Sequence, residues 1–180
     1  DKDQASSVIV NAKLRRPEIC GATETLLIHS GHPSEDIGYV LDNLRSQGCE
    51  IIGCDRLKEI YPIDRAATED DWSTEYLDKK ISVKIVDNIE ESIDHINKYS
   101  SGHTECCLSD SQQSVELFFQ NCKSAILMNN ASTQFADGGE FGFGAEIGIS
   151  TDKLHVRGPV GAKHLTTFKY QVKGNNTTRP

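Results

Sequence analysis

The sequence lacks any apolar run that approaches the roughly 20 residues a membrane-spanning helix requires. It also lacks an excess of positive charge, because 19 lysines and arginines stand against 27 aspartates and glutamates, a formal net charge of -8. Such a chain carries little of the phosphate-neutralising charge that nucleic-acid binding needs, and anionic membranes do not attract it. We therefore expect neither nucleic acid nor a membrane as a partner, whereas small anionic metabolites are not excluded.

Signals for export and for metal binding are also missing. The first residues show no basic segment followed by an apolar one, so no signal peptide is evident. Most of the six cysteines lie in or beside apolar segments, and none has the paired C-x-x-C spacing of a zinc site. His29, His95 and His103 form no ligand pattern, and we interpret each as solvated or capped. These features predict a cytoplasmic protein with reduced thiols and no metal site.

The 180 residues suffice for one domain with a hydrophobic core, and their apolar periodicity switches repeatedly between helix-like and strand-like. Helices are expected at residues 4–15, 34–47, 89–96 and 111–119, and strands at residues 25–29, 49–54, 81–86, 106–108 and 124–128. Residues 64–73 are polar and are expected to form a loop. Strands that alternate with helices predict an α/β fold, a mostly parallel sheet with helices on both faces.

This alternation ends after Asn129. Residues 131–148 are rich in glycine and have no apolar period, which is typical of a functional loop. They do not form a dinucleotide fingerprint, because Gly142 and Gly144 would need a third glycine where Ile147 lies. Residues 165–172 alternate loosely and predict an exposed strand. Because an exposed strand edge usually finds a partner, we expect a subunit contact there.

Cys20 differs from the other cysteines because it lies between a predicted helix and a predicted strand. Arg15 and Arg16 come shortly before it, and Gly21 follows it. Positive charge stabilises a thiolate, and glycine lets a substrate approach the sulfur. The residues alone leave two interpretations open, a reactive nucleophile and a structural cysteine in a turn.

The segment around Cys20, residues 11–27 (NAKLRRPEICGATETLL), resembles the active-cysteine segment of the gamma-glutamyl phosphate reductase family. This family, also called glutamate-5-semialdehyde dehydrogenases, is a branch of the aldehyde dehydrogenase superfamily. Further matches follow in the same order along the chain. They lie at residues 71–77 (DWSTEYL), 93–99 (IDHINKY), 101–105 (SGHTE), 130–135 (NASTQF), 137–142 (DGGEFG), 157–161 (RGPVG) and 165–170 (LTTFKY). One departure is Gly21, because many members of the family have asparagine there.

The resemblance implies a division of the chain into two parts. Residues 1–160 would form the catalytic domain of an aldehyde dehydrogenase-like protein, and residues 161–180 a C-terminal oligomerisation segment that contains the exposed strand. Proteins of the family are more than twice as long, and their N-terminal cofactor-binding domain has no counterpart in this chain. We therefore expect the chain to fold, to form homo-oligomers through the C-terminal strand, and to be inactive by itself.

The resemblance also implies an activity, the NADPH-dependent reduction of L-glutamyl 5-phosphate to L-glutamate 5-semialdehyde and phosphate. This is the second step of proline biosynthesis from glutamate. Cys20 would be the catalytic nucleophile that forms a thioester with the substrate. Glu75 would hold the ribose of the nicotinamide cofactor.

Further roles are implied around Cys20. Substrate contacts are expected from Arg16, Ser132, Thr133, Gly138 and Gly139. Arg16 would bind the phosphate or lower the pKa of the Cys20 thiol, and the alternative is a surface charge at a helix end. We expect Glu24 to be structural, because this direction of the reaction needs no activated water.

Two alternative functions stay open at this point. One is an aldehyde-oxidising relative that uses NAD and needs a carboxylate base to activate water against the thioester. The other is a catalytically silent subunit or interaction domain, which would show a degraded motif around Cys20. That motif is largely intact in this sequence.

Overall fold

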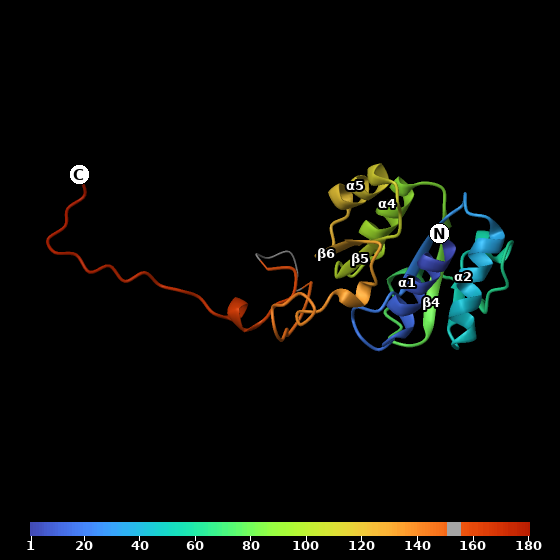
Figure 1. The fold of residues 1–180 in the computed structure, drawn as a ribbon, viewed down its shortest axis with the longest axis horizontal. Coiled ribbons are helices and arrows are strands. Elements are labelled where there is room, and N and C mark those ends of the chain that lie inside the picture. The colour runs from blue at the N-terminus through green and yellow to red at the C-terminus, as the bar shows by residue number, and fades with distance from the viewer. Residues whose placement is uncertain (151–155) are drawn as a thin grey trace.

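The computed structural model describes residues 1–150 and 156–180, and two parallel sheets form the body of the protein (Figure 1). The larger sheet has the strand order β1-β4-β2-β3. Its strands are β1 (Thr25–His29), β2 (Glu50–Gly53), β3 (Arg65–Ala66) and β4 (Lys80–Val86). The smaller sheet pairs β5 (Thr104–Cys107) with β6 (Ile126–Asn129). The predicted parallel α/β architecture is confirmed, with its strands divided between two sheets.

Helices connect most of these strands, as the apolar periodicity predicts. The α-helices are α1 (Lys2–Leu14), α2 (Ser34–Ser46), α3 (Asp55–Lys58), α4 (Ile89–Tyr99) and α5 (Gln112–Asn121). Short 3-10 helices are η1 (Glu69–Ser73), η2 (Thr133–Phe135) and η3 (Ala162–Leu165). Local capping explains several helix starts: the side chains of Asn88 and Ser111 accept hydrogen bonds from backbone N–H groups in the first turns of α4 and α5.

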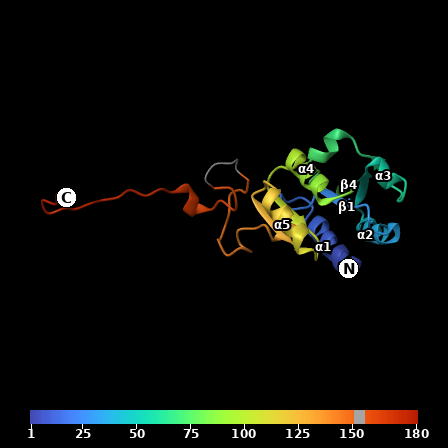
Figure 2. The same cartoon turned by 90° about the horizontal axis from the view of Figure 1, so that it is seen from above.

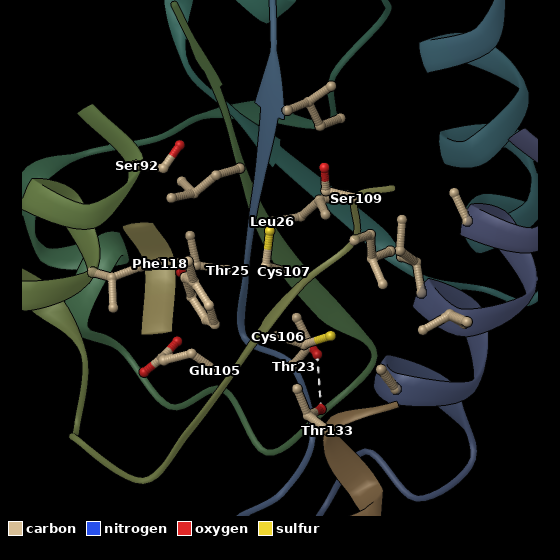
Figure 3. A pocket seen from close by; sticks show the side chains of 18 of the residues that line it. Thr23, Thr25, Leu26, Ser92, Glu105, Cys106, Cys107, Ser109, Phe118 and Thr133 are labelled. Atoms are coloured by element: carbon tan, nitrogen blue, oxygen red, sulfur yellow. Dashed lines mark hydrogen bonds between the residues drawn. The ribbon is translucent and has the colours of Figure 1, made fainter. Parts of the chain in front are cut away.

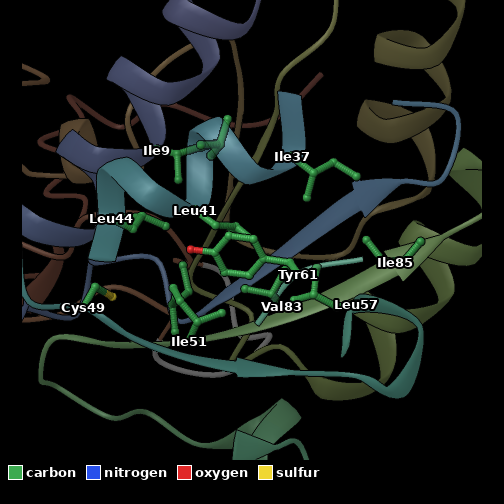
Figure 4. Close-up of a cluster of buried hydrophobic side chains, with 12 residues drawn as sticks. Ile9, Ile37, Leu41, Leu44, Cys49, Ile51, Leu57, Tyr61, Val83 and Ile85 are labelled. Carbon is green, nitrogen blue, oxygen red and sulfur yellow. The ribbon is translucent and has the colours of Figure 1, made fainter. Parts of the chain in front are cut away.

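Helices α1 and α2 cover one face of the larger sheet. Side chains alternate along β4, and Ile81, Val83 and Ile85 turn to this face and pack under both helices (Figure 4). The core here also contains Ile9, Ile37, Val40, Leu41, Leu44, Ile51, Leu57 and Tyr61. Full burial of one such aliphatic side chain contributes roughly 1.5–3 kcal/mol, so this face supplies the main hydrophobic stabilisation.

The opposite face of the larger sheet mixes polar side chains with the buried Ile52 and Val86, and it is covered by α4 and the segment that contains η1 (Figure 2). Ser82 Oγ lies 2.8 Å from the hydroxyl of Tyr76, and Lys84 Nζ lies 3.4 Å from His95 Nδ1 on α4. Helix α4 also packs against α5 and the smaller sheet, through a second core of Ile93, Phe118 and Cys122. Helices therefore cover both faces of the larger sheet, as expected.

Two segments differ from their predicted structure. The predicted loop at residues 64–73 contains β3 and η1, because Arg65 and Ala66 pair with β2 and an ion pair between Arg65 and Asp71 closes the segment. The predicted strand at residues 165–172 is wrong for the single chain, because the described tail has no neighbouring strand to pair with. Phe168 and Tyr170 are 77% and 85% exposed, and the tail runs away from the body (Figure 1).

Candidate active site

Cys20 lies in a tight turn that follows α1. Backbone bonds close this turn: Ala22 N–H donates to the carbonyl of Ile19 over 3.0 Å, and Thr23 N–H donates to the carbonyl of Ala12 over 3.1 Å. All six cysteines are free thiols, and Cys20 is exposed whereas the other five are buried or half-buried. The turn therefore presents the Cys20 thiol at the surface, where a substrate can reach it.

Helix η2 supports this turn from far along the sequence. Thr23 Oγ1 and Thr133 Oγ1 lie 3.0 Å apart, and their hydroxyls face each other (Figure 3). Gln134 Nε2 donates a hydrogen bond of 2.9 Å to the carbonyl of Ala12. A Cβ atom on Gly21 would lie 3.4 Å from the carbonyl oxygen of Thr133, so the turn packs closely on η2.

Glu24 connects the Cys20 segment to the Glu75 segment. Its Oε2 lies 2.6 Å from Lys13 Nζ, and its Oε1 accepts a 3.2 Å hydrogen bond from the backbone N–H of Leu77. Burial raises the pKa of Glu24, and the paired Lys13 opposes that rise. Both carboxylate oxygens are thus used within the chain, which supports the structural role expected for Glu24.

A large open cleft of about 1430 Å³ runs between α1 and β1 on one side and α4, β5 and α5 on the other (Figure 3). Cys20, Glu75 and Thr133 line this cleft, so the structure brings these three predicted site residues together. The remaining predicted site residues are not among those that line it: Arg16, Ser132, Gly138 and Gly139. The side chain of Arg16 is exposed at the end of α1.

The surroundings of the Cys20 thiol raise its pKa above the ordinary value. Partial burial raises its pKa, and so do the negative charges of Glu146 and then Glu75. The backbone N–H groups of Cys20 and Gly21 act in the opposite direction. The charges with the largest effects on this pKa are negative, and the effect of Arg16 on the thiol stays a prediction.

Several of the groups that are predicted to contact the substrate already have partners within the chain. Ser132 Oγ accepts a 3.3 Å hydrogen bond from Gln134 N–H. Gly138 N–H donates to Glu146 Oε2 over 2.9 Å, and Gly139 N–H donates to Asp137 Oδ1 over 2.8 Å. The glycine-rich loop of residues 131–148 therefore binds carboxylates of the chain itself in this structure.

The histidine interpretation was wrong for two of the three residues. His95 and His103 are buried, and the Nε2 atom of each has no hydrogen-bond partner among the described residues. Burial lowers the pKa of His95 to about 4 and also lowers the pKa of His103. The negative charge of Glu75 opposes this lowering at His103. His95 packs between the rings of Trp72 and Tyr99. The helical spacing of Ile89, Ile93 and Ile96 could have predicted this burial, because it places His95 next to the buried face of α4.

The part of the chain that the structure describes contains neither a metal-binding cluster nor a membrane-spanning helix. No group of three or more His, Cys, Asp or Glu side chains there is arranged to hold a metal ion. Nor does any helix in residues 1–150 and 156–180 have the length and apolar character needed to cross a membrane.

Comparison with known proteins relates this geometry to a family. No family model matches the chain. Among curated relatives, a gamma-glutamyl phosphate reductase from Brucella suis is 54% identical over 179 residues, which are 99% of this chain and 42% of the relative. One from Zymomonas mobilis is 50% identical over 180 residues, again 42% of the relative. The chain thus spans less than half the length of the curated relatives it matches.

Solved structures lead to the same group. The gamma-glutamyl phosphate reductase of Thermotoga maritima is 47% identical and superposes with a TM-score of 0.93, over 100% of this chain and 44% of that one. The enzyme of that name from Saccharomyces cerevisiae is 25% identical with a TM-score of 0.59, over 84% of this chain and 40% of that one. An acetylating aldehyde dehydrogenase from Geobacillus thermoglucosidasius, 16% identical over 98% of this chain and 50% of that one, shares the fold with a TM-score of 0.64. The chain is therefore similar, from end to end, to part of the gamma-glutamyl phosphate reductases, and it has the aldehyde dehydrogenase-like fold.

Proposed function

We propose that the chain is the C-terminal catalytic part of a reductase that converts L-glutamyl 5-phosphate to L-glutamate 5-semialdehyde in proline biosynthesis. The observation that carries this proposal is the exposed Cys20 thiol, presented by a tight turn on a cleft that Glu75 and Thr133 also line. The 54% identity to a gamma-glutamyl phosphate reductase supports the choice of substrate.

The chemistry follows from an acyl phosphate that meets a thiol. The sulfur of Cys20 attacks the C5 carbonyl, the bond between C5 and the phosphate oxygen breaks, and a thioester remains. The thiol proton leaves the sulfur, and the phosphate departs as hydrogen phosphate. NADPH, when bound, supplies the hydride that reduces the thioester to the aldehyde. Release of the aldehyde returns the sulfur of Cys20 for the next cycle.

The residues of the chain bind and orient in this scheme. The backbone N–H groups of Cys20 and Gly21 lower the pKa of the thiol and so favour the attacking thiolate. Arg16, exposed just before Cys20, is proposed to contact the phosphate. Ser132, Thr133 and the loop at Gly138 and Gly139 are proposed to hold the rest of the substrate.

Glu75 fits a cofactor role. Its carboxylate is exposed on the same cleft as Cys20, so it can accept hydrogen bonds from ribose hydroxyls. We place most of the nicotinamide site in the part of the relatives that this chain does not span, and we expect the isolated chain to be inactive. We also propose that residues 161–180 form homo-oligomer contacts and that the protein is cytoplasmic.

The test is the reaction run backwards, in a chain extended to the full length of its relatives. Reduction of NADP by glutamate semialdehyde should require inorganic phosphate and should vanish in Cys20→Ala. Cys106→Ala is the matched control, because Cys106 lines the same cleft but has no proposed role. Activity without phosphate would indicate an aldehyde-oxidising relative that uses NAD. A folded, full-length protein without activity would indicate a silent interaction domain.

A further inference from the structure

Leu77, two residues after Glu75, has a strained backbone. Its φ angle is +50°, in the left-handed region that residues with a Cβ atom rarely adopt. The Leu77 side chain is 48% exposed and belongs to neither hydrophobic core of the described residues, so its packing does not explain this conformation. Strain of this kind persists where the surroundings hold it, and it is frequent at binding and catalytic sites.

The contact that holds Leu77 comes from the carboxylate of Glu24. The backbone N–H of Leu77 donates to Glu24 Oε1 over 3.2 Å, and Glu24 Oε2 lies 2.6 Å from Lys13 Nζ. The Lys13 side chain is fully buried, so its ammonium group fixes the orientation of the carboxylate. The backbone of Glu24 is fixed too, because its carbonyl accepts a 3.0 Å hydrogen bond from Ser82 N–H in β4. Glu24 therefore holds Leu77 from a rigid position.

The other hydrogen bonds of residues 74–77 lead to different parts of the fold. Thr74 Oγ1 donates to a backbone carbonyl of η1 over 2.7 Å. The Tyr76 hydroxyl contacts one side chain of η1 and one of β4. Within the described hydrogen-bond network, the carboxylate of Glu24 is thus what connects this segment to the segment of Cys20.

On the other side, Glu24 is the fourth residue after Cys20. The turn between them is closed by backbone bonds, such as that from Ala22 N–H to the carbonyl of Ile19 over 3.0 Å, and does not use the Glu24 carboxylate. Cys20, Glu24 and Glu75 all line the same cleft. Glu24 therefore links the candidate nucleophile to the proposed ribose-binding residue at the wall of one cleft.

We infer that Glu24 is a positioning residue, which fixes Glu75 relative to Cys20 so that a nicotinamide cofactor held by Glu75 lies against the acylated thiol. The inference rests on the proposed function, because it needs a cofactor ribose at Glu75 and a thioester at Cys20. Glu24 itself contacts neither group. Reacting atoms must approach to about 3–3.5 Å, so a small displacement of the cofactor slows the reaction strongly.

Two double variants separate this role from the stability that the ion pair supplies. Lys13→Met with Glu24→Gln removes both charges, and the amide oxygen of the glutamine remains free to accept Leu77 N–H. Lys13→Met with Glu24→Met removes the same charges and leaves Leu77 N–H without its acceptor. Because neither variant keeps an unpaired buried charge, both should fold, which urea unfolding checks. Both are made in a chain extended to the full length of its relatives.

The dissociation constant of NADPH is measured by fluorescence titration. We expect the variant without the acceptor to bind NADPH roughly tenfold more weakly than the variant that keeps it, the effect of about one lost hydrogen bond. The KM for NADP should rise in the same ratio. The KM for phosphate and the rate at which iodoacetamide alkylates Cys20 should be the same in both variants, because the turn around Cys20 is closed without Glu24.

A third comparison tests whether Glu24 acts through Glu75. Glu75→Gln should itself weaken NADPH binding, and in its presence the two double variants should bind NADPH equally, because residues that act as one unit are not additive. Glu24→Asp gives a test without any change at Lys13. It keeps the charge but withdraws the acceptor by one methylene group, so it should weaken NADPH binding and leave the alkylation of Cys20 unchanged.

Opposite results would overturn the inference. If the two double variants bind NADPH equally while Glu75 is present, the bond to Leu77 does not position the cofactor. If their difference persists in Glu75→Gln, Glu24 acts on the fold in general and not through Glu75. A full-length wild type that binds no NADPH would contradict the proposed function and this inference together.

Discussion

The ammonium group of Lys13 lies 2.6 Å from Glu24 Oε2, and the Lys13 side chain is fully buried where it makes this contact. The other oxygen of Glu24 accepts the N–H of Leu77. One carboxylate thus joins the helix before Cys20, the strand after it and the segment that carries Glu75. A buried charge without its partner is costly, so this pair fixes the arrangement of the site.

Replacing one partner of this pair should destabilise the protein strongly. We expect Glu24→Gln to lower the free energy of unfolding by about 3 kcal/mol, because the buried ammonium of Lys13 loses its counter-charge. Urea unfolding measures the change. Glu18→Gln, an exposed glutamate near Cys20, is the control and should stay within about 0.5 kcal/mol. A Glu24→Gln variant as stable as the control would show that the pair contributes little.

Asp71 should contribute stability that disappears in acid. Arg65, Thr68 and Tyr76 all donate hydrogen bonds to its carboxylate and hold its pKa well below the usual range. Ionised Asp71 therefore stabilises the fold above the unfolded-state pKa of about 4, and this contribution is lost as the pH falls below it.

We expect Asp71→Asn to cost about 2–3 kcal/mol at pH 7, and the difference from the wild type should shrink below pH 4. Chemical unfolding at a series of pH values measures both effects. The adjacent Asp70→Asn is the control, because Asp70 is exposed and its side chain accepts none of these bonds. A difference that does not change with pH would indicate a packing effect.

His95 should make the fold sensitive to mild acid. Its pKa is lowered to about 4 by burial, whereas the unfolded chain has a histidine pKa of about 6.5. The unfolded state therefore binds more protons between these values, and stability is lost as the pH falls from 6.5 towards 4. The free energy of unfolding should fall by about 3 kcal/mol over this whole pH range. His95→Phe keeps the ring contacts with Trp72 and Tyr99 and should remove this loss, whereas the exposed His32→Gln should not.

Two glycines near the site should respond in opposite ways to alanine. A Cβ atom at Gly21 meets nothing closer than 3.4 Å, whereas one at Gly138 would lie 2.9 Å from the carbonyl oxygen of Gly144. We expect Gly21→Ala to stay within about 0.5 kcal/mol of the wild type and Gly138→Ala to lose about 1–3 kcal/mol. Thermal unfolding of both variants measures the difference. Equal effects would mean that the loop around Gly138 adapts freely.

The C-terminal tail should matter for assembly and not for folding. Phe168, Tyr170 and Val172 are exposed, and within residues 1–150 and 156–180 they belong to neither hydrophobic core. We expect Phe168→Ser with Tyr170→Ser to leave the free energy of unfolding of the dissociated chain unchanged and to weaken self-association at least tenfold. Sedimentation equilibrium measures the association. Wild-type chains that stay monomeric at high concentration would contradict the proposed oligomer contact.

The sequence predicts most of this fold because its helices and strands are long and apolar on one side. The strand at residues 25–29 was predicted with its observed bounds, since Leu26, Leu27 and Ile28 form an uninterrupted apolar run. Strand β3 was missed because Arg65 and Ala66 carry no apolar pattern and are held by an ion pair to Asp71. The division into two sheets depends on tertiary pairing, which periodicity does not encode.

The candidate site was predictable in part. The turn around Cys20 is local, so its sequence suffices to indicate it. Glu146 accepts a hydrogen bond from Gly138 N–H and raises the pKa of the Cys20 thiol. Both effects depend on how the glycine-rich loop folds back, and no short-range sequence pattern shows this. The burial of His103 likewise depends on neighbours from distant segments.

The contact between Thr23 and Thr133 joins residues that are 110 positions apart. Ribosomes add roughly 5–20 residues per second, so the turn around Cys20 emerges some 5–20 seconds before η2 exists to support it. During that interval the thiol is exposed on a nascent chain whose site is incomplete. The surroundings of Cys20 are therefore completed only after η2 has been synthesised, and any cellular thiol chemistry that acts on Cys20 has its widest access before that point.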